Sequence, residues 1–231
     1  MYEHFEEIYK GGNPDEIPWN NEQPPELLVE LVETRLRQGY AGQGGKVRPG
    51  RALDLGCGLG NYAIWLAGRG FDVVGMDASP TAIKIAKRNA KEKKVKCKFV
   101  VADLTARWPD WGGQFDFVYD WGLLHHIMPE NRDKYVENVH RVLKQGGKYL
   151  SLCFNEKDTA FSAGRLSAEG RGKYRGTNLG TNVYLSSEKE LRELFGRFFK
   201  IIDFRVQEIA GKFMTHVFNY CFMERNLWTA P

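Results

Sequence analysis

The chain has 231 residues, of which 42% are hydrophobic, 13% aromatic and 27% charged, the composition of a soluble globular protein with a core. This composition excludes a collagen-like repeat, a wholly disordered chain and a disulfide scaffold. The 33 basic and 29 acidic side chains leave a net charge of only +4, too small a bias to predict a nucleic-acid partner.

Cysteine spacing and the N-terminal composition indicate the compartment. No CxxC pair or histidine at metal-ligand spacing accompanies the four cysteines, which are Cys57, Cys97, Cys153 and Cys221. The first residues, MYEHFEEIYKGG, are acidic and contain no apolar stretch like that of a secretory leader. No run approaches the roughly 20 apolar residues of a membrane helix. We therefore expect no metal, no membrane association and a cytoplasmic location.

Glycines and prolines punctuate the first part of the chain, so residues 1–25 are predicted to form a loop-rich arm that contains Pro18 and Trp19. A helix is predicted to begin at Glu26, because the apolar residues after it recur at helical spacing. It is predicted to end in the glycine-rich stretch 41–45.

Short apolar runs then alternate with helical segments, which is the pattern of a mostly parallel sheet covered on both faces. The predicted strands are Arg51–Leu55, Asp72–Met76, Lys98–Val101, Phe115–Tyr119 and Lys148–Phe154. The predicted helices are Asn61–Gly68, Pro80–Lys91 and Arg132–Leu143, the second with Ser79 as its N-cap. Strands and helices in this order predict an α/β, doubly wound fold.

A polar, glycine-rich segment at 161–182 interrupts this alternation and is too long for a simple connection, so we expect it to cover or complete a site. Ser187 and Glu190 form a capping box for a further helix. Strand-like runs follow at Lys200–Val206 and Phe213–Met223. We expect a single domain with an N-terminal arm and helix (1–45), a core (46–155), a lid-like insertion (156–186) and a C-terminal helix with strands (187–231).

The stretch ALDLGCGLGNYAIWLA carries the strongest chemical signal. Its strand contains Asp54 and runs into Gly56, Gly58 and Gly60 just before a helix. Such glycines permit a sharp turn and a close approach of a ligand to the backbone and to the free N–H groups of the helix start. The dinucleotide fingerprint GxGxxG would need glycine where Asn61 stands, so the pattern is DxGxGxG. Its carboxylate would repel a pyrophosphate and suits a ligand that bears an ammonium group.

This loop and the ends of three further strands resemble the corresponding motifs of the class I methyltransferases that use S-adenosylmethionine (SAM). The resemblance spans roughly residues 18–154. It implies a Rossmann-like, mostly parallel seven-stranded sheet with an antiparallel C-terminal strand, and SAM as the cofactor, converted to S-adenosylhomocysteine (SAH). In VVGMDAS, Asp77 matches the carboxylate that binds the ribose hydroxyls, whereas a helix cap or a surface carboxylate is the alternative. In VVADL, Asp103 matches the residue that faces the adenine amino group, with Leu104 beside the ring.

The fourth strand end, FDFVYDWGLLHHI, places Asp120 and Trp121 at the wall beside the methionine moiety and the methyl group, again by resemblance. The tryptophan that matches Trp19 helps to cover the pocket in relatives, and an anchor for the N-terminal arm is the equal alternative. The predicted cofactor-binding residues are Trp19, Asp54, Gly56, Cys57, Gly58, Asn61, Asp77, Ala78, Asp103, Leu104, Asp120 and Trp121.

The chain is most similar to the small-molecule branch that includes thiopurine, thiol, halide and tellurite methyltransferases, through PWNNEQPPELL, LLHHI and RVLKQGGKYL. His125 and His126 follow the fourth strand, so either could orient a nucleophile or accept its proton, and His125 is the candidate catalytic residue. Both histidines, with Arg165 and Tyr184 in the insertion, are candidate substrate-binding residues. Hydrogen-bonded structural histidines and a solvated loop are the alternatives.

We therefore expect in-line methyl transfer to a small soft nucleophile, such as a thiol, a halide or a chalcogen. A thiolate or halide would need no general base, whereas an oxygen or nitrogen acceptor usually would. The alternatives are a methyltransferase for protein or RNA, whose usual appended recognition domain is not seen, and a non-catalytic SAM-binding module. A nicotinamide-dependent oxidoreductase is disfavoured by the missing third fingerprint glycine. The basic run KEKKVKCK at 91–98 has no interleaved aromatic residues and is expected to be a solvated helix end.

Overall fold

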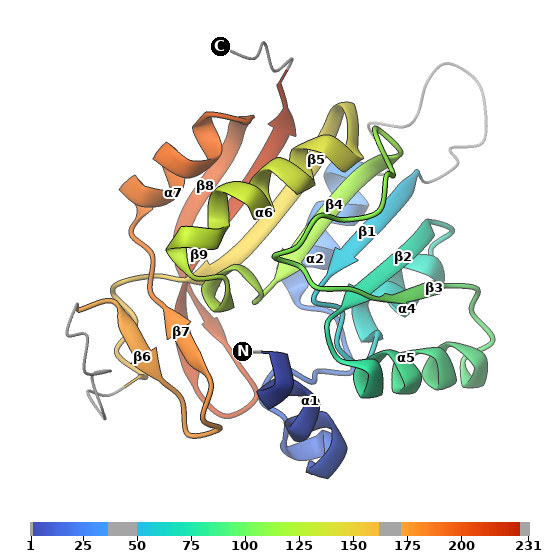
Figure 1. Cartoon of the computed structure of the whole chain (residues 1–231). Coiled ribbons are helices and arrows are strands. Elements are labelled where there is room, and N and C mark those ends of the chain that lie inside the picture. The colour runs from blue at the N-terminus through green and yellow to red at the C-terminus, as the bar shows by residue number, and fades with distance from the viewer. Residues whose placement is uncertain (1, 37–49, 162–171, 227–231) are drawn as a thin grey trace.

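The structure is a computed structural model and describes residues 2–36, 50–161 and 172–226 of the chain (Figure 1). A seven-stranded sheet in the order β3-β2-β1-β4-β5-β9-β8 forms its centre. The strands are β1 (Arg51–Leu55), β2 (Asp72–Asp77), β3 (Lys98–Val101), β4 (Phe115–Trp121), β5 (Leu143–Phe154), β8 (Phe199–Ala210) and β9 (Thr215–Arg225). β1 to β5 pair in parallel, and β9 is antiparallel to both β5 and β8. The predicted doubly wound sheet with one antiparallel C-terminal strand is confirmed.

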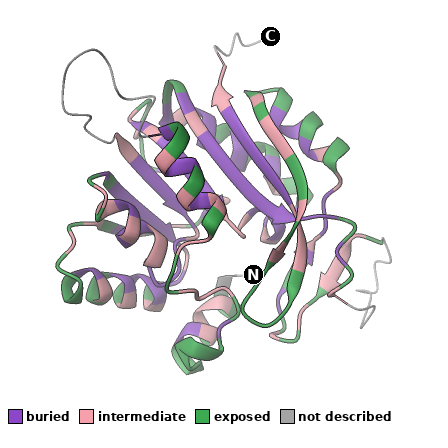
Figure 2. Cartoon of the chain, turned by 180° about the vertical axis from the view of Figure 1, so that it is seen from behind, coloured by how far each residue is buried: buried purple, intermediate pink, exposed green. Residues whose placement is uncertain are grey.

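Helices cover both faces of this sheet, because neighbouring residues of a strand point to opposite faces. On one face, Leu53 and Leu55 pack in a cluster with apolar residues of α6 (Pro129–Val142) and α7 (Glu188–Gly196). On the other face, Ala52 packs in a cluster with residues of α2 (Glu26–Leu31), α4 (Asn61–Ala67) and α5 (Pro80–Glu92). Figure 2 shows the central strands buried along most of their length, whereas the helices each expose one side.

The predicted loop in the N-terminal arm is wrong, because residues Tyr2–Gly11 form helix α1. The glycines and prolines of the arm begin only at the end of this helix. Before them, Phe5, Ile8 and Tyr9 stand at i, i+3 and i+4, the spacing of an apolar helical stripe. This stripe packs in a cluster with the buried Leu59 of the glycine loop. In Figure 1, α1 lies between the β6–β7 hairpin and α5.

Other boundaries differ by a few residues. α2 begins at Glu26 as predicted and continues as a π-helical turn, η2 (Val32–Leu36), and its predicted end at 41–45 lies outside the described residues. α6 begins at Pro129 rather than Arg132, with the proline in its first turn, and β5 begins at Leu143 rather than Lys148. The predicted N-cap of α5 and the capping box of α7 are both present.

The short elements lie at the carboxyl ends of the parallel strands. They are η1 (Pro14–Glu16), η3 (Leu124–His126), β6 (Tyr174–Gly176) and β7 (Asn182–Tyr184). β6 and β7 pair as a separate two-stranded sheet. Both belong to the predicted lid-like insertion, of which residues 162–171 lie outside the described residues.

Candidate active site

A cavity of about 100 Å³ lies where β1, β2 and β4 end. Open parallel sheets bind their ligands at this edge. The predicted residues in its lining are Trp19, Asp54, Gly56, Cys57, Gly58, Asn61, Asp77, Ala78, Leu104, Trp121 and His126. Sequence reasoning did not identify the lining residues Phe5, Tyr9, Asn20, Asn21, Leu59, Tyr62, Gly122, Leu123 and Ile127. Most of these flank a predicted residue, and the helical stripe of α1 was the signal for Phe5 and Tyr9.

The glycine loop between β1 and α4 forms the floor of the cavity. Gly58 has a φ of +50°, and a Cβ atom added there would lie 2.9 Å from the Tyr9 hydroxyl oxygen. At Gly60, with φ of +81°, an added Cβ would meet Phe99 and Ala86 at 2.8 and 2.9 Å. The loop therefore needs glycine both for its left-handed backbone and for the space that a side chain would occupy.

Asp77 at the end of β2 braces this loop. Its Oδ2 accepts a hydrogen bond from the Gly58 N–H at 2.9 Å, and its Oδ1 accepts one from the Ser79 N–H at 2.9 Å. Burial raises the pKa of this carboxyl, which is only 8% exposed. The N-cap of α5 is Ser79, so Asp77 is neither that cap nor a surface carboxylate.

Asp54 also lines the cavity, and it lies on the same face of the sheet as Asp77. Burial raises the pKa of its carboxyl to about 7, and the nearby carboxyls of Asp77 and Asp120 add to this rise. A cation in the cavity would stabilise the ionised form of Asp54. The cavity thus combines a buried carboxyl that suits an ammonium group, a second carboxyl at the next strand end, a glycine floor and the apolar side chain of Leu104. This set of groups fits SAM.

Helix α1 covers the cavity through aromatic residues. The Trp19 indole N–H donates to the Tyr9 hydroxyl at 2.9 Å, and the rings of Trp19 and Phe5 meet edge to face at 5.8 Å. Trp19 therefore both lines the cavity and anchors the arm, so the two alternatives for it are compatible. Glu6 fastens α1 to the start of α5, since it accepts hydrogen bonds from Ser79 Oγ at 2.5 Å and from Thr81 N and Oγ1 at 3.1 and 2.7 Å. Although its partial burial acts in the opposite direction, these bonds lower the pKa of Glu6 to about 2.

Replacing Glu6 by glutamine is expected to loosen this cover. The change removes the charge and one acceptor oxygen at a helix N-terminus, a loss of about 1–3 kcal/mol. Hydrogen exchange of the α1 amides should speed up accordingly. The matched control is Glu7→Gln on the same helix, whose side chain is 69% exposed and pairs with Lys10. Equal exchange rates in the two variants would contradict this role of Glu6.

Three predicted residues, Asp103, Asp120 and Tyr184, are not part of the cavity lining. Asp103 is exposed, and its Oδ1 accepts from the Thr105 N–H at 2.8 Å in the turn after β3. Asp120 lies on the opposite face of β4 from Trp121, where its carboxyl accepts from the Tyr149 and Tyr135 hydroxyls at 2.5 and 3.2 Å. Burial raises the pKa of Asp120 to about 6. The Tyr184 hydroxyl donates to Glu190 at 2.7 Å.

The two histidines after β4 have different surroundings. His126 lines the cavity, its ring meets Phe5 edge to face at 4.8 Å, and its Nδ1 donates to the Asn182 carbonyl at 3.1 Å. His125 is buried behind it, stacked on Phe154 at 4.0 Å, and its Nδ1 has no hydrogen-bond partner. Burial lowers the pKa of His126 to about 4 and that of His125 well below its ordinary value. Both imidazoles are therefore neutral at physiological pH. The fourth candidate substrate residue, Arg165, lies outside the described residues.

Arg132 holds the η3 turn that carries these histidines. Its buried guanidinium donates to the carbonyls of Leu124 and Ile127 at 3.2 and 2.8 Å, and to Ser186 Oγ at 2.9 Å. It also lies 4.7 Å from the centre of the Tyr184 ring. The planar guanidinium thus joins the end of η3 to the segment between β7 and α7.

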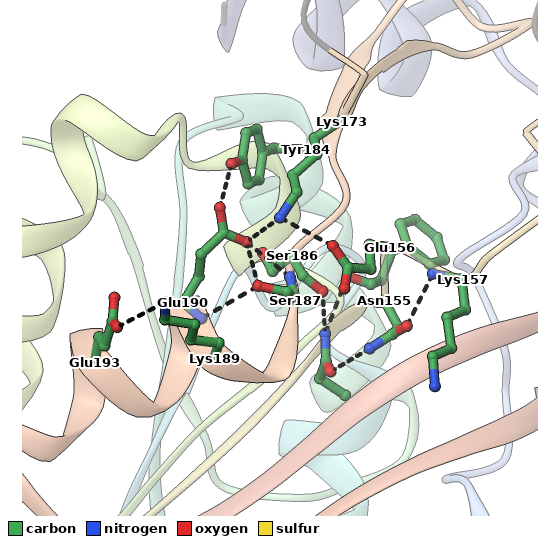
Figure 3. Close-up of polar contacts among 12 residues, drawn as sticks. Asn155, Glu156, Lys157, Lys173, Tyr184, Ser186, Ser187, Lys189, Glu190 and Glu193 are labelled. Carbon is green, nitrogen blue, oxygen red and sulfur yellow. Dashed lines mark hydrogen bonds and ion pairs between the residues drawn. The ribbon is translucent and has the colours of Figure 1, made fainter.

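A second polar network fixes that segment (Figure 3). Glu190 accepts hydrogen bonds from Lys173 Nζ, the Tyr184 hydroxyl and the Ser187 N–H at 2.7, 2.7 and 2.8 Å, and Lys173 also pairs with Glu156 at 3.0 Å. Although burial opposes them, these contacts lower the pKa of Glu190 to about 2. The network ties the β6–β7 hairpin to the start of α7.

Replacing Arg132 by methionine is expected to destabilise the protein by about 1–3 kcal/mol, because three buried acceptors lose their donor. Arg132→Lys should not restore this stability, since one ammonium cannot reach all three acceptors in the same geometry. Urea denaturation measures the free energy of unfolding of both variants. The control Arg88→Met, at an exposed i,i+4 pair on α5, should change stability by less than about 0.5 kcal/mol. A loss in Arg132→Met no larger than in the control would contradict this assignment.

Residues 2–36, 50–161 and 172–226 contain no group of three or more histidine, cysteine, aspartate or glutamate side chains that could hold a metal ion. Among these residues no helix has both the length and the apolar composition needed to cross a membrane.

Comparison with known proteins finds similarity to methyltransferases. Residues 52–147 match the family described as "Methyltransferase domain". A 2-heptyl-1-hydroxyquinolin-4(1H)-one methyltransferase of Mycobacteroides abscessus is 34% identical over 157 residues, which cover 66% of this chain and 64% of that protein. A tRNA N(3)-cytidine methyltransferase of Gallus gallus is 31% identical over 202 residues, which cover 80% of this chain and 54% of that protein. A probable thiol methyltransferase of Arabidopsis thaliana is 28% identical over 138 residues, which cover 59% of this chain and 56% of that protein.

A solved structure has a similar fold. A solved structure from work on the conversion of a disulfide bond into a thioacetal group during echinomycin biosynthesis matches with a TM-score of 0.75 and 24% identity, over 100% of this chain and 94% of that one. The chain spans between about half and two thirds of the length of the three curated relatives. Residues 52–147 are therefore similar to a methyltransferase domain, and the sheet has the Rossmann-like fold of the solved methyltransferase structures.

Proposed function

We propose that this protein transfers the methyl group of SAM to a small-molecule acceptor. The observation that carries the proposal is the cavity in which Asp54, Asp77 and the glycine loop meet under a cover of aromatic residues. SAM bound there would supply an electrophilic methyl group on a sulfonium. The residues of the chain align donor and acceptor and exclude water, and alignment alone can contribute about 7–11 kcal/mol to the rate.

The proposed contacts follow the chemistry of the lining. Asp54 holds the ammonium group, because a cation there relieves the cost of ionising a buried carboxyl. Asp77 accepts from the ribose hydroxyls while it braces Gly58, and Leu104 packs against the adenine. Trp121 and His126 line the part of the cavity formed by the end of β4 and η3, where the acceptor approaches. The single-domain organisation with a lid-like insertion remains part of this proposal.

The acceptor atom that we favour is a soft nucleophile, a thiol, a halide or a chalcogen. The sequence motifs after β4 and in the N-terminal arm support this choice, and one relative is named as a probable thiol methyltransferase. Another relative is named for a hydroxyquinolinone, which extends the candidates to aromatic heterocycles. Four free cysteines suit a reducing compartment, so the proposal includes a cytoplasmic location.

Labelled SAM and a panel of thiols, halides, chalcogen oxyanions and small amines test the proposal. Methylation of a member of this panel is the expected result. SAH binding without transfer to any small acceptor would overturn the proposal and favour a non-catalytic binding module.

RNA methylation is the second candidate, because a relative that covers 80% of this chain is named as a tRNA methyltransferase. The same assay with total tRNA as acceptor distinguishes the two functions. Transfer of label to tRNA and to no small molecule would establish the second candidate in place of the first.

A further inference from the structure

Of the five histidines, all of which the structure describes, only His126 lines the cavity. Its Nδ1 lies 3.1 Å from the carbonyl oxygen of Asn182 in β7, and the Phe5 ring of α1 meets its ring edge to face at 4.8 Å. A carbonyl oxygen can only accept, so His126 carries its proton on Nδ1 and has a lone pair on Nε2. Within residues 2–36, 50–161 and 172–226, this Nε2 has no hydrogen-bond partner. The tautomer is therefore fixed, and Nε2 is available to accept a hydrogen bond.

The surroundings of His126 keep its imidazole neutral. Burial lowers its pKa to about 4, although the hydrogen bond to Asn182 acts in the opposite direction. The titratable groups near it are His125, whose ring lies 4.4 Å away, and the carboxyls of Asp54 and Asp77 in the same cavity lining. A weak base is sufficient here, because methyl transfer moves the positive charge of the sulfonium onto the acceptor atom. Any hydrogen left on that atom then becomes strongly acidic.

The charged side chains in the cavity lining are both acidic. They are Asp54 and Asp77, and within the part of the chain that the structure describes no lysine or arginine lines the cavity. SAM would add one net positive charge, fewer than the two carboxyls can carry together. An anionic acceptor would therefore lose its hydration without gaining a cation of the protein as a partner, which is costly. The lining favours an acceptor that enters uncharged, and a thiol or hydroxyl that does so still carries its hydrogen.

We propose that the acceptor enters the cavity uncharged, with a hydrogen on the atom to be methylated, and that His126 Nε2 is the catalytic base that removes this hydrogen as a proton. The inference rests on the proposed small-molecule function and narrows its acceptors to protic ones. The proton moves to Nε2 as the acceptor atom forms a bond to the methyl carbon. The electron pair of the broken carbon–sulfur bond stays on sulfur, which leaves as SAH, and His126 then releases its proton to water. His125 has no part in this step, because it is not in the cavity lining.

The test compares two aromatic thiols in His126→Asn. The asparagine amide N–H can replace the Nδ1–H that donates to the Asn182 carbonyl, but the variant has no base in place of Nε2. Benzyl mercaptan is protonated at neutral pH, whereas 4-nitrothiophenol is already ionised. We expect kcat/KM for benzyl mercaptan to fall by about 10²-fold or more, with little change for 4-nitrothiophenol. Raising the pH until benzyl mercaptan ionises should restore the activity of the variant.

His216→Asn is the matched control. His216 also uses its Nδ1, which lies 3.0 Å from Asp158 Oδ2, and His216 is not part of the cavity lining. This variant should keep the wild-type kcat/KM with both thiols. Equal losses for the two thiols in His126→Asn, or a loss for benzyl mercaptan that is as large in the control, would overturn the inference.

Nitrogen NMR of the imidazoles gives a readout without turnover and keeps the test decisive if His126→Asn fails to fold. In the wild-type protein His126 should be the Nδ1–H tautomer at neutral pH, and benzyl mercaptan added with SAH should shift its Nε2 resonance. A protonated Nε2, or no shift on this addition, contradicts the inference. Wild-type protein that methylates 4-nitrothiophenol but not benzyl mercaptan overturns this inference alone, whereas transfer to no small acceptor at all overturns the proposed function with it.

Discussion

Replacing Asp54 by asparagine is expected to stabilise the ligand-free protein above neutral pH while it weakens SAH binding. The folded state raises the pKa of this carboxyl from 3.8 to about 7, so folding opposes its ionisation. The resulting loss of stability is absent at pH values below the unfolded-state pKa of 3.8. It grows as the pH rises from 3.8 to about 7 and is complete above pH 7. Removing a charge buried in this way should add on the order of 2–4 kcal/mol of stability at high pH.

The same carboxyl is the proposed partner of the ligand's ammonium group. A lost charge-assisted hydrogen bond is worth about 1.5–3 kcal/mol, so Asp54→Asn should bind SAH roughly 10–100 times more weakly. Urea denaturation at pH 5 and pH 8 with calorimetry measures both effects. Asp72→Asn, whose side chain is 75% exposed, is the control that should show neither. A stability difference from wild type that is the same at both pH values would contradict the raised pKa.

Gly58→Val is expected to weaken SAH binding by about 100-fold or more. Valine would hold a β-branched residue at φ of +50° and place its Cβ 2.9 Å from the Tyr9 hydroxyl, in the floor that the ligand must approach. The left-handed backbone alone should destabilise the protein by about 1–3 kcal/mol.

Gly146→Val separates these two effects. Gly146 also has a positive φ, of +73°, but an added Cβ there meets nothing within 4 Å. It should show the loss of stability without the loss of binding, which calorimetry and denaturation measure on the same samples. Equal loss of SAH binding in the two variants would show that Gly58 has no direct role in the cavity.

The parts of the site that the sequence predicts are those fixed by local rules. A strand that runs through Asp54 into three glycines and a helix has few possible geometries, and the structure gives Gly56, Gly58 and Gly60 the positive φ that this pattern requires. Asp77 likewise follows from its place at the end of a strand before the N-cap Ser79. Such positions depend on backbone stereochemistry within a few residues.

The remaining positions depend on packing between distant segments. Asp120 and Trp121 are adjacent in sequence, yet strand alternation sends them to opposite faces, and only the sheet order shows which face holds the cavity. His125 is withdrawn from the cavity by stacking on Phe154, which belongs to another strand. Asp158 and His216 are 58 residues apart, and β9 must pair with β5 before they meet. Single-sequence reasoning has no access to these contacts.

Titration of the protein with SAH by calorimetry, for wild type and for Asp77→Ala, tests the central claim most directly. Asp77 braces Gly58 and is the proposed partner of the ribose, so its removal affects the binding site at both points. The account predicts saturable SAH binding by the wild-type protein and its loss in a folded Asp77→Ala variant. No binding by the wild type, or equal binding by both proteins, would contradict it.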